Sequence, residues 1–163
     1  CGDGEKGCGM AELLTRSAEQ TKALGARLAA QLNAGDVLLL EGDLGAGKSE
    51  LTRGIARGLG ISEPVTSPTF TILQVHMGGR LPLYHFDWYR LQSAEELYEL
   101  SLDEYLYADG VSVVEWPSMA EEAIPERHLR IGIETLGECE RRFSFMPMGG
   151  FHALEIAALE GNG

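Results

Sequence analysis

Residues 37–49, which read VLLLEGDLGAGKS, decide the fold of this 163-residue chain. The apolar run from Val37 to Leu40 predicts a buried strand. Directly after it, GDLGAGKS (42–49) matches the phosphate-binding pattern G-x-x-x-x-G-K-[ST] in full. This stretch predicts a strand, a glycine-rich turn and a helix whose first N–H groups face a phosphate.

Each part of this loop has a role in holding a nucleotide. Gly42, Gly45 and Gly47 let successive N–H groups turn inward around phosphate oxygens, because no Cβ blocks those backbone conformations. Lys48 is expected to reach the β- and γ-phosphates, and the Ser49 hydroxyl to bind Mg²⁺. A glycine-rich turn that binds nothing is the alternative, but the strand before it and the helical pattern after it favour nucleotide binding.

The overall charge limits the partners that this chain can bind. It has 13 basic and 25 acidic residues and a formal net charge of −12. Nucleic-acid binding depends largely on Lys and Arg contacts to phosphates, so direct binding of RNA is not expected. If the protein serves an RNA pathway, we expect it to act through a protein partner with a basic surface.

The composition predicts a cytoplasmic protein that does not enter a membrane. No apolar run approaches the roughly 20 residues that a membrane helix needs. Three cysteines, Cys1, Cys8 and Cys139, have no spacing typical of a metal site or of a disulfide framework. Residues 1–9 are expected to be a disordered tail or a processing remnant, and residues 10–163 a single P-loop ATPase domain.

Strand and helix patterns alternate along the chain. Helices are expected over 17–32, where Ser17 to Gln20 has the form of a capping box, and over 48–59 and 94–107. Strands are expected over 11–16, 71–77, 81–86, 111–114, 129–134 and 142–146, the second and third joined as an antiparallel hairpin. Residues 151–163 fit a strand or a short helix. These patterns predict an α/β fold, a P-loop NTPase-like three-layer sandwich with a mostly parallel central sheet and antiparallel edge strands.

Two acidic residues follow strands that could lie beside the loop. Glu115 ends the apolar VSVV strand, and Asp87 ends LYHF. Hydrolysis of a nucleotide needs a carboxylate near the metal or its water, and both positions fit that need. His85 is interpreted as a hydrogen-bonded sheet residue rather than a base. Trp88 and Trp116, each next to an acid, are expected to be partly buried packing residues or to shield the site.

The segment between the loop helix and the hairpin has two interpretations. Two prolines, Pro64 and Pro68, exclude a helix here. Three hydroxyl side chains lie close together in the same segment, those of Thr66, Ser67 and Thr69. The segment is either a connecting loop or a switch whose hydroxyls approach the γ-phosphate and Mg²⁺.

Four motifs in this order carry a resemblance to a known family. GDLGAGKS (42–49), TSPTFTI (66–72), YHFDWYRL (84–91) and VVEWP (113–117) together resemble the TsaE (YjeE) family of bacterial ATPases. The resemblance covers roughly residues 12–135. It implies a slow Mg²⁺-dependent ATPase that supports tRNA threonylcarbamoyladenosine (t6A) synthesis with TsaB-like and TsaD-like partners, and that contacts tRNA only indirectly through them.

The resemblance also implies roles for single residues. The phosphates would be cradled by Asp43, Leu44, Gly45, Ala46, Gly47 and Lys48. Mg²⁺ would be coordinated by Ser49, where the family usually has threonine, and by Glu115. Asp87 would take part in catalysis with Lys48 and Glu115. Thr69 lies in the family's first switch segment, and Arg141 and Arg142 lie near a family arginine.

Two other functions fit the same loop. A small-molecule kinase would need a second substrate pocket and an arginine-rich lid. A nucleotide-gated binding module would use ATP only to order the switch.

Overall fold

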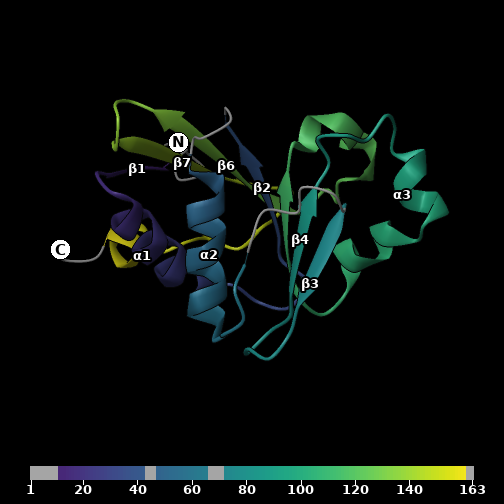
Figure 1. The fold of residues 1–163 in the computed structure, drawn as a ribbon, viewed down its shortest axis with the longest axis horizontal. Coiled ribbons are helices and arrows are strands. Elements are labelled where there is room, and N and C mark those ends of the chain that lie inside the picture. The colour runs from purple at the N-terminus through teal and green to yellow at the C-terminus, as the bar shows by residue number, and fades with distance from the viewer. Residues whose placement is uncertain (1–10, 43–46, 66–71, 161–163) are drawn as a thin grey trace.

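A computed structural model describes residues 11–42, 47–65 and 72–160, which form one seven-stranded sheet with helices on both faces (Figure 1). The strands are β1 (Ala11–Thr15), β2 (Val37–Glu41), β3 (Leu73–His76), β4 (Leu83–Asp87), β5 (Val111–Glu115), β6 (His128–Thr135) and β7 (Arg141–Met148). The helices are α1 (Ala18–Ala29), α2 (Lys48–Leu59), α3 (Glu95–Glu99), α4 (Ile156–Glu160) and the 3₁₀ helices η2 (Leu102–Tyr107) and η3 (Pro117–Ala123). The predicted tail at 1–9 and the predicted switch residues Thr66, Ser67 and Thr69 lie outside the described residues.

The sheet has a parallel centre and antiparallel edges, as predicted. Its strand order is β1-β7-β6-β2-β5-β4-β3. β2 pairs in parallel with β5 and β6, and β4 pairs in parallel with β5. β3 pairs with β4, and β7 with β6 and β1, in antiparallel fashion, so the predicted hairpin is confirmed. The central strands are apolar runs because helices cover both of their faces.

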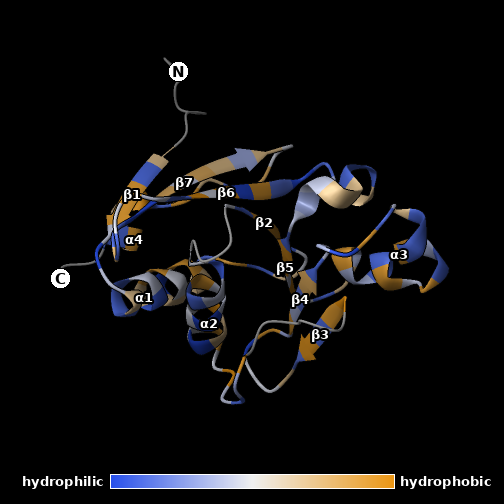
Figure 2. Cartoon of the chain, turned by 45° about the horizontal axis from the view of Figure 1, so that its top comes forward, coloured by the Kyte–Doolittle hydropathy of each residue, from blue (hydrophilic) through white to orange (hydrophobic). Residues whose placement is uncertain are grey.

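Alternate side chains of the central strands supply two separate cores. Leu38, Leu40 and Val113 pack in one core with α1 and α2, whereas Val37 and Leu39 lie in a second core with α3, η2 and η3. Figure 2 shows α1 and α2 on one side of the sheet and α3 on the other. The predicted three-layer sandwich is therefore confirmed.

Helices α1 and α2 pack closely because glycines face each other's backbone. A Cβ at Gly54 would overlap the carbonyl oxygen of Lys22, and one at Gly25 would lie 2.9 Å from the backbone nitrogen of Ile55. The predicted capping box starts α1, since the Ser17 hydroxyl accepts from the Gln20 N–H at 3.1 Å. The close approach of α1 and α2 at Gly25 and Gly54 fixes the position of α2, which begins at the loop.

The predicted continuous helix over 94–107 is wrong. The chain forms α3, then turns at Ser101, whose φ of 58° lies in the left-handed region, and continues as η2. Leu97 and Leu106 are buried, whereas Leu100, next to the break, is 61% exposed. The segment carries acidic residues at close spacing without basic partners, which weakens a long helix.

The C-terminal segment, which fits two element types from sequence, packs into the same core as α1 and ends in the short helix α4. Asp36, fully buried before β2, accepts hydrogen bonds from Arg127 Nη2 at 3.0 Å and from His152 Nε2 at 2.9 Å. Arg27 Nη1 donates to the carbonyl of Leu159 at 3.4 Å. These polar contacts tie the segment to α1 and β2. No helix in the described part of the chain is long and apolar enough to span a membrane.

Candidate nucleotide site

Helix α2 begins directly beyond the carboxyl end of β2, as the loop pattern predicts. Gly47, the residue before the helix, has a φ of 108°, in the left-handed region that favours glycine. Lys48 starts the helix and is only 5% exposed. Residues 43–46 lie outside the described residues, so their part in the phosphate cradle stays a prediction.

The Lys48 ammonium group lies between the start of the loop and the end of β5. Its Nζ donates a 2.9 Å hydrogen bond to the carbonyl oxygen of Gly42. The same atom lies 3.9 Å from the centroid of the Trp116 ring, one residue beyond β5. A cation on an aromatic face is stabilised by the ring quadrupole. These contacts keep the positive charge at the edge of the sheet where the loop begins.

The two candidate acids lie at that same edge. Asp87 and Glu115 are the last residues of β4 and β5 and are register partners. On the other side of β5, Leu40 of β2 is the register partner of Glu115. The hairpin does not remove Asp87 from the site, because β4 runs parallel to β5 although β3 is antiparallel. Carboxyl ends of parallel strands are where ligands bind in open α/β sheets.

The carboxyl group of Asp87 is harder to ionise than an ordinary aspartate. Burial raises the pKa of Asp87, and the nearby charge of Glu115 raises it further. The backbone N–H of Tyr89, which donates to Oδ1 at 3.0 Å, opposes this rise, as do the charges of His85 and Lys48. The site thus contains one carboxyl group whose affinity for a proton is increased.

Glu115 is held by a buried histidine. His85 Nε2 lies 2.7 Å from Oε2 of Glu115, and the two residues are 1% and 6% exposed. The interpretation of His85 as a hydrogen-bonded sheet residue is confirmed, and its partner is now known. Sequence reasoning missed this partner because the two residues are 30 positions apart.

The two tryptophans beside the acids differ in their surroundings. Trp88 is fully buried and packs edge-on to Phe86, with ring centroids 5.8 Å apart. Trp116 is partly exposed, has a φ of 60°, and lies beside Tyr89 with ring centroids 5.0 Å apart. A non-glycine residue in the left-handed region is strained, and such strain is common at functional sites. Trp88 is thus a core residue, whereas Trp116 covers Lys48.

A family model for the threonylcarbamoyl adenosine biosynthesis protein TsaE matches residues 15–143, which include the loop and both acids. The chain belongs to the TsaE family. The resemblance drawn from the four motifs is therefore confirmed over most of the chain.

Relatives of known name agree with this assignment. The tRNA threonylcarbamoyladenosine biosynthesis protein TsaE of Bacillus subtilis is 48% identical over 135 residues, which cover 83% of this chain and 84% of that protein. The protein of the same name from Treponema pallidum is 40% identical over 131 residues, covering 80% and 96%. The crystal structure of Bacillus subtilis YdiB superposes with a TM-score of 0.76 at 43% identity, covering 86% of this chain and 87% of that one. This likeness supports the P-loop fold described above.

Of two neighbouring arginines in this chain, Arg141 and Arg142, one lies by the loop. Arg141 Nε is 3.9 Å from the position that a Cβ on Gly47 would occupy. Its Nη1 donates to the carbonyls of the β6–β7 turn, at 2.9 Å to that of Gly137. Arg142 instead pairs at 2.8 Å with Glu134, its register partner on β6. The register of β7 makes this choice, which spacing along the chain does not reveal.

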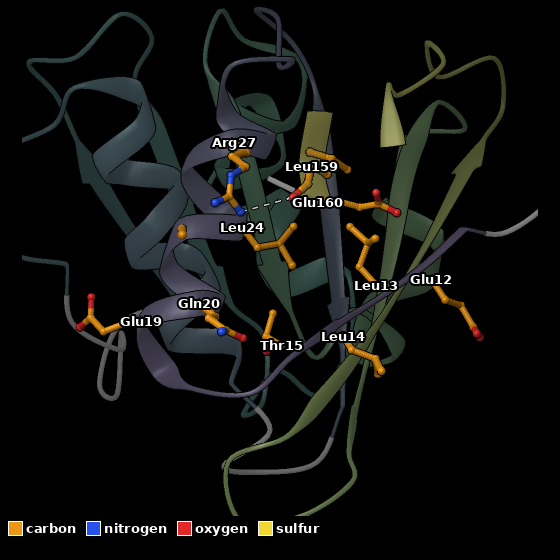
Figure 3. A pocket seen from close by; sticks show the side chains of 11 residues that line it. Glu12, Leu13, Leu14, Thr15, Glu19, Gln20, Leu24, Arg27, Leu159 and Glu160 are labelled. Carbon is orange, nitrogen blue, oxygen red and sulfur yellow. Dashed lines mark hydrogen bonds between the residues drawn. The ribbon is translucent and has the colours of Figure 1, made fainter. Parts of the chain in front are cut away.

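A cavity of about 530 Å³ lies elsewhere, between β1, α1 and α4 (Figure 3). Its apolar lining includes Leu13, Leu24 and Leu159. Its polar lining includes carboxylates, and the guanidinium of Arg27 donates to the Leu159 carbonyl, shown as a dashed line in Figure 3. A lining rich in carboxylates repels phosphates, so we do not assign the nucleotide to this cavity.

Proposed function

We propose that this TsaE-family chain is a Mg²⁺-dependent ATPase that hydrolyses ATP in support of t6A synthesis, together with TsaB-like and TsaD-like partners. The observation that carries the proposal is the meeting of Lys48, Asp87 and Glu115 at one edge of the sheet. A cation at the start of a helix and two acids on neighbouring strand ends are the parts that phosphoryl transfer requires.

Several features favour a triphosphate as the ligand. The 12-residue helix α2 directs its first N–H groups and the positive end of its dipole toward the loop. Gly47 has a backbone conformation that brings the chain close to an anion without a side chain in the way. Lys48 can exchange its hydrogen bond to a neutral carbonyl for stronger contacts with phosphate oxygens.

The residues present also suit Mg²⁺. The donors near the start of α2 and the end of β5 are a hydroxyl, on Ser49, and a carboxylate, on Glu115, and Mg²⁺ prefers oxygen ligands. When bound, the ion would neutralise charge on the β- and γ-phosphate oxygens. Ser49 and Glu115 are therefore the residues that we assign to it.

The protein's own groups would then act in hydrolysis as follows. Lys48 stabilises negative charge on the leaving phosphates. Asp87 or Glu115 orients the attacking water. Asp87 is the better candidate to receive a proton, because burial raises its pKa, whereas Glu115 already accepts a hydrogen bond from His85. The aromatic ring of Trp116 covers Lys48 and limits the water that reaches it.

An acidic face supports the proposed dependence on protein partners. Residues 92–109 contain no basic side chain and six acidic ones, namely Glu95, Glu96, Glu99, Asp103, Glu104 and Asp109. Apolar side chains are exposed on the same segment, with Tyr98 at 44%, Leu100 at 61% and Tyr107 at 70%. Such a surface fits a partner with a basic, partly apolar surface, whereas it disfavours direct contact with tRNA.

Measuring phosphate release from ATP, with and without the TsaB-like and TsaD-like proteins, tests the proposal. We expect slow release by the chain alone, faster release with the partners, and loss of release on adding EDTA. Glu115→Gln and Asp87→Asn should each lower kcat by roughly 100-fold or more, typical of removing a catalytic acid or base. Equal rates with and without partners would contradict the partner dependence.

The same variants separate the ATPase from a nucleotide-gated binding module. If hydrolysis stops in Glu115→Gln and t6A synthesis still proceeds at the wild-type rate, binding rather than hydrolysis is the function. Transfer of the phosphoryl group to a metabolite instead of water would identify a kinase.

A further inference from the structure

Buried between β3 and β5, the side chain of His85 has a single hydrogen-bond partner among the described residues. Its Nε2 lies 2.7 Å from Oε2 of Glu115, and its exposed fraction is 1%. An ionised carboxylate can only accept, so Nε2 carries the hydrogen and is the donor. The other ring nitrogen, Nδ1, is buried and has no partner among the described residues, so the contact to Glu115 is what fixes the ring.

Strand register makes this contact diagonal across the sheet. His85 is the register partner of Val113, and Asp87 is the register partner of Glu115. In parallel strands these four side chains lie on one face of the sheet. His85 therefore contacts Glu115, which lies two residues beyond its register partner Val113 on β5. The contact engages Oε2 of Glu115. Glu115 is the last residue of β5 and precedes Trp116, whose ring lies 3.9 Å from Lys48 Nζ.

We propose that His85 is a positioning residue for the nucleotide site: it holds one oxygen of Glu115 so that the other faces the metal and the phosphates. This inference rests on the ATPase proposed above. His85 acts only through Glu115 and is not itself assigned to the substrate.

A purely structural role explains this pair poorly. Both polar side chains are buried, with 1% of His85 and 6% of Glu115 exposed, and burial of polar groups is costly unless they are well paired. Apolar side chains of similar volume at such a site are often as stable or more stable. The hairpin offers a comparison, because His76 is also buried and bonds a glutamate, Glu63, at 3.1 Å. Glu63 is exposed, with 51% of its side chain accessible, and it lies outside the nucleotide site.

The test uses three single variants of the full chain. His85→Leu removes the donor and keeps an apolar volume. His85→Gln restores an N–H donor at a similar reach. His76→Leu is the matched control, since His76 is a buried histidine of the same hairpin and also forms a hydrogen bond with a glutamate. Thermal melting of each variant checks that it is folded.

Two readouts are measured on each variant. Steady-state ATP hydrolysis gives kcat and KM, and electron paramagnetic resonance gives the affinity of Mn²⁺ for the protein–ADP complex. For His85→Leu we expect kcat to fall roughly 10- to 100-fold, the loss expected for a hydrogen bond to a charged group, with KM for ATP within about 2-fold. Mn²⁺ affinity should weaken several-fold. His85→Gln should recover most of both losses, and His76→Leu should leave both within about 2-fold of wild type.

A double variant gives a further check. Combining His85→Leu with Glu115→Gln should cost no more than Glu115→Gln alone, because His85 acts through that carboxylate. The inference is overturned if His85→Leu keeps wild-type kcat and Mn²⁺ affinity. It is equally overturned if His85→Gln is no better than His85→Leu, or if the two losses multiply in the double variant. A wild-type chain that hydrolyses no ATP overturns the proposed function instead, and Mn²⁺ affinity still decides the role of His85.

Discussion

Replacing Gly54 with alanine places a methyl group directly against the backbone of α1. The new Cβ would overlap the carbonyl oxygen of Lys22 and would lie 2.8 Å from its carbonyl carbon and 2.9 Å from its Cα. These are backbone atoms, so no side-chain rotation can relieve the overlap, and the two helices must move apart. Alanine gains about 1 kcal/mol in helix propensity over glycine. Overpacking costs about 1–3 kcal/mol and occasionally more, and a backbone overlap belongs at the upper end.

The expected balance is a loss of about 2 kcal/mol in the free energy of unfolding. For a chain of this length each kcal/mol shifts Tm by about 2–4 °C, so Tm should fall by about 4–8 °C. Thermal melting followed by circular dichroism measures this shift. Gly137→Ala is the control, since the nearest atom to its new Cβ is 3.9 Å away, and it should leave Tm unchanged or slightly raised.

Helix α2 also carries the candidate nucleotide site, so the same variant bears on function. If α2 shifts to relieve the overlap, Lys48 moves with it and ADP affinity falls together with Tm. An unchanged Tm in Gly54→Ala would refute the reasoning, because helix propensity would then have outweighed the clash with Lys22.

Three further predictions follow from single contacts. Lys48→Met should weaken ATP binding at least roughly tenfold in calorimetry, since a charge-assisted contact to phosphate is lost; equal affinity would contradict its role. Burial raises the pKa of Asp87, so the stability that its neutral form provides is present below the ordinary aspartate pKa and is lost as pH rises through the raised folded-state value. Asp87→Asn should therefore raise Tm at pH 7 in metal-free buffer and lose this advantage in acid, and a lower Tm at pH 7 would show that ionised Asp87 stabilises the fold. Arg80 Nη2 donates to the carbonyls of Ala29 at 2.7 Å and Leu32 at 3.1 Å, and Arg80→Ala should lower stability to urea by about 1.5–3 kcal/mol. An unchanged urea midpoint would mean that water replaces Arg80 at the end of α1.

Much of the fold could be predicted because it depends on short-range patterns. The apolar run before the loop and the helical spacing after Lys48 are local features, and they were sufficient to predict β2 and α2. The hairpin followed from two glycines between strand patterns. The prediction of one helix over 94–107 was wrong, because helix propensity does not reveal the left-handed turn at Ser101. With this turn, both Leu97 and Leu106 are buried in the core.

By itself, the sequence determined a match to the phosphate-binding loop pattern, two acids at strand ends and membership of one family, because motifs and periodicity act over a few residues. Only the tertiary structure decided which side chains meet. It paired His85 with Glu115, brought Arg141 rather than Arg142 to the loop, and tied His152 to Asp36. Each of these pairs joins residues 30 or more positions apart in sequence. Such contacts depend on strand order and register, which are set by packing of the whole sheet and not by local pattern.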